Sequence, residues 1–121
     1  MANFSIGEMQ KMQRILQEKY KRKWEPVDAA TGRNKLLWMV GEIGEVIDII
    51  KKRGDDEIMH NPETRRHLIE ELADVQMYLA DVMLCYGVTA EEYSDVHARK
   101  HARNMKRDYV EENRHLFDGK P

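Results

Sequence analysis

The sequence is poor in the residues that interrupt helices and in those that cross-link chains. Its 121 residues include 7 glycines, 3 prolines and a single cysteine, Cys85, and only 7% of them are aromatic. One cysteine excludes an intrachain disulfide and a zinc site built of several thiolates, and it is typical of a reducing compartment. So few helix breakers and β-forming residues predict a helix-rich soluble domain rather than a β-sandwich or a disordered chain.

The chain also lacks a dominant charge and a long apolar run. Its 20 basic and 22 acidic residues give a formal net charge of -2, so no overall field recruits nucleic acid or an anionic membrane. No run approaches the roughly 18 apolar residues that span a bilayer, and the first residues do not resemble a signal peptide. We therefore expect a cytoplasmic protein with no membrane span and no nucleic-acid partner.

Helix-capping residues and apolar residues at helical spacing predict four helices. These cover residues 6–23, 34–53, 62–86 and 90–112, with a loop over 25–32 and a frayed tail over 113–121. In the second predicted helix a regular apolar stripe is expected to be buried; it consists of Leu36, Val40, Ile43, Ile47 and Ile50. The pattern predicts an all-α fold, a four-helix-bundle-like unit forming one domain over residues 1–121. Because one such unit leaves apolar faces uncovered, we expect it to self-associate.

Each of the two most apolar predicted helices contains a pair of acidic residues, which we call an acidic step. Glu42 and Glu45 are three residues apart, as are Glu71 and Asp74, so each pair shares a helix face. Like charges at this spacing destabilise an open helix by roughly 0.2–0.5 kcal/mol per pair, which predicts a compensating ligand. If the two helices are neighbours, the four carboxylates suit Mg²⁺ or Mn²⁺. Such a site favours phosphoryl or nucleotidyl transfer to water, with a carboxylate as base.

The acidic steps resemble the motifs of a known family. Gly41-Glu42-Ile43-Gly44-Glu45 and Glu71-Leu72-Ala73-Asp74 are similar to the E-E-x-x-E and E-x-x-D motifs of the MazG-like all-α NTP pyrophosphohydrolases. This superfamily includes the dimeric dUTPases and the phosphoribosyl-ATP pyrophosphohydrolases. Gly41 departs from the pattern, because the family often has a glutamate at that position.

The resemblance implies both a site and an activity. Glu42, Glu45, Glu71 and Asp74 would be the Mg²⁺ ligands, with Glu42 and Glu45 as the catalytic residues. A nucleoside triphosphate would be hydrolysed to the monophosphate and pyrophosphate, and the protein would be a homodimer or a dimer of dimers.

Further residues are candidates for contacts with the nucleotide substrate. Trp38, one turn before Glu42, could stack on a base, with Asn34 and Lys35 a further turn back. Tyr78, one turn after Asp74, could bond a ribose hydroxyl or a carboxylate, and Asp81 continues the acidic row as a support for the ligands. The family's K-x-x-x-N-x-x-R element, which handles phosphates, is matched by Lys100, Asn104 and Arg107.

Two other interpretations remain open. A di-iron carboxylate bundle needs Glu-x-x-His on two helices, and residues 57–60 and 112–115 fit that short pattern, but they fall in a connection and in the tail. The second alternative is a non-enzymatic helical interaction module that self-associates or pairs with a partner helix. It explains the amphipathic helices but not the acids on both central ones.

Overall fold

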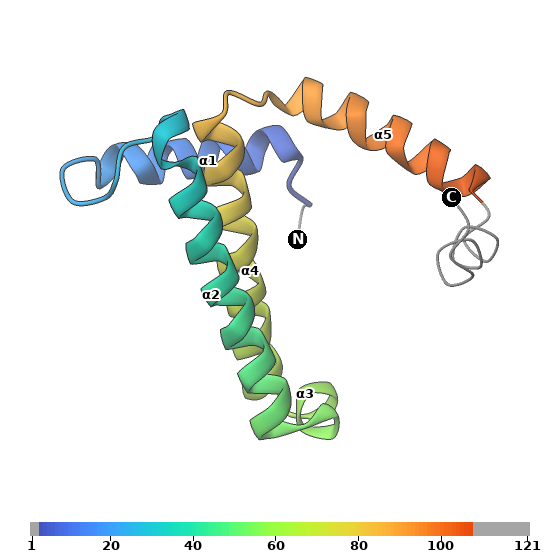
Figure 1. Cartoon of the computed structure of the whole chain (residues 1–121). Coiled ribbons are helices and arrows are strands. Elements are labelled where there is room, and N and C mark those ends of the chain that lie inside the picture. Colours follow the sequence, from blue (N-terminus) through green and yellow to red (C-terminus); the bar gives the residue numbers. More distant parts are fainter. Residues whose placement is uncertain (1–2, 108–121) are drawn as a thin grey trace, which may run out of the picture. The chain divides into compact units, whose positions relative to one another are not determined.

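The protein is all-α, as predicted. The computed structural model describes residues 3–107, which form five helices and no strand (Figure 1). The helices are α1 (Ile6–Lys19), α2 (Ala29–Arg53), α3 (Asp55–His60), α4 (Pro62–Cys85) and α5 (Ala90–Lys106). The chain divides into two compact units, Met1–Ala90 and Glu91–Pro121, and α5 belongs to the second apart from its first residue.

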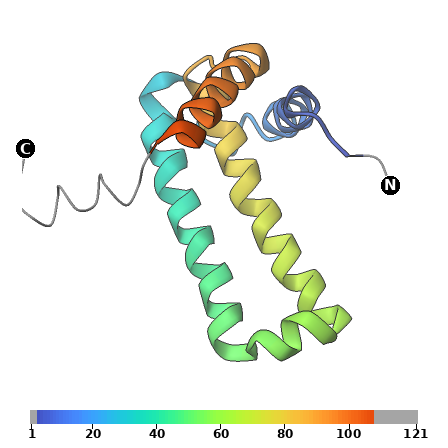
Figure 2. The ribbon, with the colours of Figure 1, turned by 90° about the vertical axis from the view of Figure 1, so that its right-hand side faces the viewer.

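The first unit is built on an antiparallel pair of long helices, α2 and α4, with the short α3 at the bend between them (Figures 1 and 2). Gly54 ends α2 with a φ of 84°, a conformation that glycine adopts without steric cost. Asn61 caps α4, and Pro62 occupies its first turn. Because the two helices run in opposite directions, the middle of α2 lies beside the middle of α4.

The helix α1 crosses α4 near its C-terminal end, as both views show (Figures 1 and 2). The capping box predicted at Ser5 and Glu8 is present. The face that α1 buries is polar and consists of Gln10, Gln13 and Gln17. The side-chain amide of Gln10 donates a hydrogen bond to the carbonyl of Val88, 3.2 Å away. The side chains that α1 buries most deeply are therefore glutamines rather than apolar residues.

Several predicted helix boundaries are wrong. The second long helix begins at Ala29 rather than at residue 34, because Asp28 and Thr31 form a reciprocal capping box. The connection after Gly54 contains the unpredicted helix α3, whose first turn carries three acids that suit a helix N-terminus. The first helix ends at Lys19 rather than at residue 23. Residues 108–121, including the predicted continuation of the last helix and the frayed tail, lie outside the described residues.

The apolar stripe of α2 was predicted to be buried, but it is exposed. Its five members, Leu36, Val40, Ile43, Ile47 and Ile50, have exposed fractions between 39% and 58%, whereas the neighbouring Ile49 is buried. Helical spacing identifies an apolar face but does not identify the element that covers it. The described residues bury more polar side chains than apolar ones, so the hydrophobic core of this chain alone is small.

No helix between residues 3 and 107 combines the length and the apolar character needed to cross a membrane.

Candidate metal and nucleotide site

Three of the four predicted acids converge at the middle of the α2–α4 pair. Glu42 comes from α2, and Glu71 and Asp74 come from α4, with one carboxylate oxygen of each within 4.8 Å of the others. Glu45, one turn further along α2, is exposed and lies outside this group. We call Glu42, Glu71 and Asp74 the carboxylate cluster.

The carboxylate cluster carries an unfavourable concentration of negative charge. Burial raises the pKa of the Glu42 carboxyl, and the charges of Asp74 and Glu71 raise it further, with a smaller contribution from Glu45. His67 lies one turn before Glu71, with 3.5 Å between its Nε2 and a carboxylate oxygen. Hard carboxylate oxygens from two helices are the ligands that Mg²⁺ and Mn²⁺ prefer, and a divalent cation would offset the repulsion. The donor set therefore fits such an ion.

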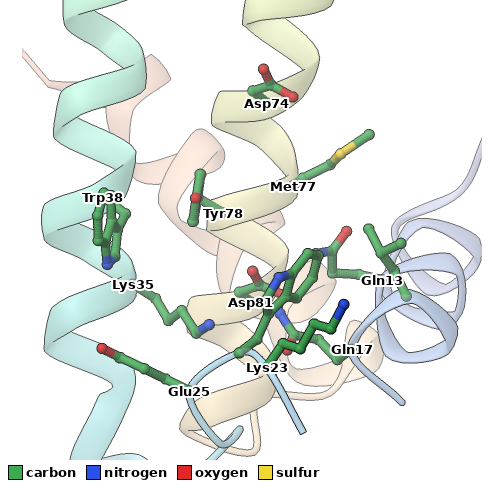
Figure 3. A pocket seen from close by; sticks show the side chains of 12 residues that line it. Gln13, Gln17, Lys23, Glu25, Lys35, Trp38, Asp74, Met77, Tyr78 and Asp81 are labelled. Atoms are coloured by element: carbon green, nitrogen blue, oxygen red, sulfur yellow. The ribbon is translucent and has the colours of Figure 1, made fainter. Parts of the chain in front are cut away.

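A cavity of about 420 Å³ extends from Asp74 towards α1 (Figure 3). Its volume falls within the range of small-molecule sites. Both tryptophans of the chain line it, Trp24 and Trp38, so it has flat aromatic walls. Its remaining lining residues are Gln13, Leu16, Gln17, Lys23, Glu25, Lys35, Asp74, Met77, Tyr78 and Asp81.

The structure brings three of the predicted substrate contacts, Trp38, Tyr78 and Lys35, into this cavity. Trp38 projects from α2 and is 60% exposed, so one side of the indole is open to a ligand (Figure 3). Tyr78 projects from α4, between Asp74 and Asp81. Burial raises the pKa of its hydroxyl, and the charges of Glu42, Asp81 and Asp74 raise it further, so the hydroxyl remains a hydrogen-bond donor.

Asp81 lies at the inner end of the cavity and does not join the carboxylate cluster. Its Oδ1 accepts a hydrogen bond of 2.9 Å from the Gln17 amide, and Asp81 is only 3% exposed. Burial raises the pKa of this carboxyl, while hydrogen bonds from Gln17 and Gln13 and the positive charge of Lys35 act in the opposite direction. Asp81 is thus a buried acid that accepts hydrogen bonds from amides and lies within the electrostatic influence of Lys35.

Several residues that line the cavity, among them Gln13, Gln17 and Trp24, were not predicted from the sequence. The glutamines carried a detectable signal, because Gln10, Gln13 and Gln17 recur at helical spacing and so predict a polar face on α1. Trp24 follows the end of α1 and stacks on Tyr20, with 4.6 Å between the ring centroids. No sequence pattern indicates that contact.

The predicted phosphate-binding row lies at the C-terminal end of α5. Lys100 and Asn104 are on the helix, and Arg107 follows its last residue, with its backbone N–H donating to the Asn104 carbonyl at 3.3 Å. These residues belong to the second compact unit. Their role in phosphate binding stays a prediction.

The Glu-x-x-His step at residues 57–60 forms part of α3. Glu57 accepts hydrogen bonds from Asn61 and Thr64, and His60 lies 3.7 Å from Asp56. Neither residue belongs to a group of three possible metal ligands within residues 3–107. The second step, at residues 112–115, lies outside the described residues.

The described residues thus form an all-α protein whose antiparallel helix pair carries three carboxylates beside a cavity, a donor set that fits a divalent cation. Residues 30–117 match the family model of the MazG nucleotide pyrophosphohydrolase domain. The match covers well over half of the chain, and the chain therefore belongs to this family. Comparisons with curated proteins and with solved structures gave no match. Family membership indicates nucleotide pyrophosphohydrolase activity, and the resemblance stated from the acidic motifs is confirmed.

Proposed function

We propose that the protein hydrolyses a ribo- or deoxyribonucleoside triphosphate to the monophosphate and pyrophosphate in the presence of Mg²⁺, and so removes unwanted nucleotides from the cellular pool. The observation that carries this proposal is the convergence of Glu42, Glu71 and Asp74 at the edge of the cavity. In the reaction, a water oxygen bonds to the α-phosphorus and the bond to the bridging oxygen breaks. Pyrophosphate leaves, and the water proton passes to a carboxylate.

The carboxylates have distinct proposed roles. Glu71 and Asp74 on α4, together with Glu42 on α2, hold the ion, and Glu45 completes the ligand set from the next turn of α2. A bound divalent ion would neutralise phosphate charge and lower the pKa of the attacking water. Glu45, which lies outside the carboxylate cluster, is proposed as the base that accepts the water proton, with Glu42 as the alternative.

The rest of the nucleotide would extend from the carboxylate cluster into the cavity. Trp38 offers a stacking surface for the base, and the Tyr78 hydroxyl can donate a hydrogen bond to the sugar. Asp81 supports the α4 side of the site from the inner end of the cavity. Lys100, Asn104 and Arg107 are proposed to bind the phosphate oxygens.

The proposed activity is tested with a nucleotide panel. The purified protein is incubated with each of the common NTPs and dNTPs and Mg²⁺, and monophosphate and pyrophosphate are quantified. We expect Asp74→Asn to lower kcat/KM by at least about 100-fold, because a metal ligand is lost. The matched control is Glu70→Gln, an exposed acid on the same helix, which should retain activity. No turnover of any nucleotide, or full activity in Asp74→Asn, would refute the proposal and favour the non-enzymatic module.

We also propose that the protein is a homodimer or a dimer of dimers that associates through the apolar stripe of α2. The stripe is a continuous exposed apolar face along one long helix, which is a usual mark of an interface. Introducing a charge by Val40→Lys should reduce the sedimentation coefficient to that of a monomer. Met59→Lys, at an equally exposed apolar residue on α3, should not change it. A wild-type protein that sediments as a monomer at about 100 μM would exclude this assembly.

A further inference from the structure

The inner end of the cavity is unusually polar for a buried place. Asp81, Lys35, Gln13 and Gln17 are each at most 6% exposed, and all four line the same cavity. Burying an acid and an ammonium group is costly unless both are fully paired. These side chains come from three helices, α1, α2 and α4, so their convergence is a product of the tertiary fold (Figure 3).

The side chains at this inner end have hydrogen-bonding capacity that is only partly filled. Gln17 and Gln13 donate to the Asp81 carboxylate, which fixes its orientation and leaves it lone pairs to accept further hydrogen bonds. Lys35 reaches from α2 into the cavity (Figure 3). Within residues 3–107 its ammonium group has no hydrogen bond or ion pair, although it lies close enough to influence the charge of Asp81. A buried acceptor with free lone pairs and an unpaired ammonium group therefore line the same cavity, from α4 and α2.

The position of this polar pair suits the far end of a nucleotide. Asp81 follows Asp74 by seven residues, which corresponds to about 10.5 Å along a helix. Tyr78 lies between them, at the level expected for a sugar. A nucleotide with its phosphates at the carboxylate cluster would therefore place its base between the tryptophan-lined walls, with the edge of the base at Asp81 and Lys35.

We propose that Asp81 and Lys35 select a base that carries an exocyclic amino group beside a ring-nitrogen acceptor, the pattern of cytosine and adenine. This inference rests on the proposed function for the identity of the ligand as a nucleotide. The amino group donates to the Asp81 carboxylate, and the ring nitrogen accepts from the Lys35 ammonium. Uracil and hypoxanthine carry a carbonyl oxygen in place of the amino group and an N–H in place of the ring-nitrogen acceptor. Their carbonyl oxygen would face the Asp81 carboxylate, and their N–H would face the Lys35 ammonium group. Buried mismatches of this kind are strongly rejected.

The selection can be measured without turnover, because both tryptophans of the chain line the cavity. Quenching of their fluorescence, excited near 295 nm and corrected for absorption by the base, reports binding of CMP against UMP and of AMP against IMP. Each pair differs only in the amino-to-keto exchange. We expect the amino member of each pair to bind at least about tenfold more tightly.

Two variants test the assignment of the residues. Asp81→Asn keeps the shape of the side chain and should lower the CMP-to-UMP affinity ratio at least about fivefold, and Lys35→Met should do the same while leaving Asp81 in place. Glu70→Gln should leave the ratio unchanged. Melting temperatures identify any unfolded variant, and Lys35→Met keeps the test decisive if Asp81→Asn does not fold.

The outcomes separate this inference from the proposed function. Equal affinities within each pair, or an unchanged ratio in a folded variant, would overturn base selection even if pyrophosphate is released from nucleotides. Selective binding that is lost in the variants would support base selection even if no nucleotide is hydrolysed. No quenching by any of the four nucleotides would overturn it outright.

Discussion

Removing one charge from the carboxylate cluster should stabilise the metal-free protein. The change that tests this is Glu42→Gln, which keeps the size and hydrogen-bonding capacity of the side chain. Two unit charges 4.8 Å apart, the upper limit of the spacing between the nearest oxygens of the cluster, repel by roughly 0.9 kcal/mol in a medium as polar as water. Glu42 meets two such charges, and screening by salt reduces their sum. We expect Glu42→Gln to raise the free energy of unfolding by about 1 kcal/mol at neutral pH.

The same substitution should weaken the response to Mg²⁺. A gain of about 1 kcal/mol corresponds to a melting temperature roughly 3–6 °C higher for a domain of this size, measured in EDTA by circular dichroism. In the wild type, saturating Mg²⁺ should raise the melting temperature through binding to the folded state, and in Glu42→Gln this rise should shrink. The matched control is Asp48→Asn, an exposed acid on α2, for which both values should equal those of the wild type.

Two results would refute this reasoning. A lower melting temperature for Glu42→Gln in EDTA would mean that Glu42 stabilises the fold through its negative charge rather than being crowded by its neighbours. An equal rise with Mg²⁺ in the wild type and in Glu42→Gln would mean that the ion binds elsewhere.

Two further predictions concern packing and pH. Gly32→Ala should lower the melting temperature, because a Cβ at this position would collide with the Tyr86 ring, whereas Gly41→Ala, where a Cβ meets nothing within 4 Å, should raise stability by about 0.5–1 kcal/mol. Burial raises the pKa of Asp81, so its contribution to stability is greatest below the unfolded-state pKa and falls as pH rises to the folded-state value. Gln17→Leu removes a donor to that carboxylate and should extend the fall to higher pH. A melting profile from about pH 4 to about pH 8 that matches the wild type would contradict this prediction.

The helices and the position of the acids could be read from the sequence because both depend on local rules. Acid residues three apart share a helix face whatever surrounds the helix, and the capping box at Ser5 and Glu8 involves only neighbouring residues. The capping box at Asp28 and Thr31 obeys the same rule but ends in threonine rather than glutamate, so the start of α2 was missed. The alternation of helix-breaking residues and apolar runs was therefore sufficient to predict the fold class but not the boundaries of each helix.

The cavity could not be predicted in the same way, because it depends on how three helices meet. Lys35 and Asp81 are far apart in the sequence and come together only because α2 and α4 are antiparallel. Gln17 reaches Asp81 because α1 crosses α4 at that level. The exposure of the α2 stripe had a similar cause, since hydrophobic spacing does not distinguish a face covered by the same chain from one left open.

The open space around Gly41 has a consequence for the chemistry of the site. Gly41 occupies the place where the acidic motif often has a further glutamate, and a side chain there would meet no other atom within 4 Å of its Cβ. The packing of the described residues thus does not require a glycine at this position. The absence of this further glutamate is therefore not imposed by the surrounding structure. A single codon change from Gly41 to glutamate could increase the negative charge of the site without rebuilding the helices around it.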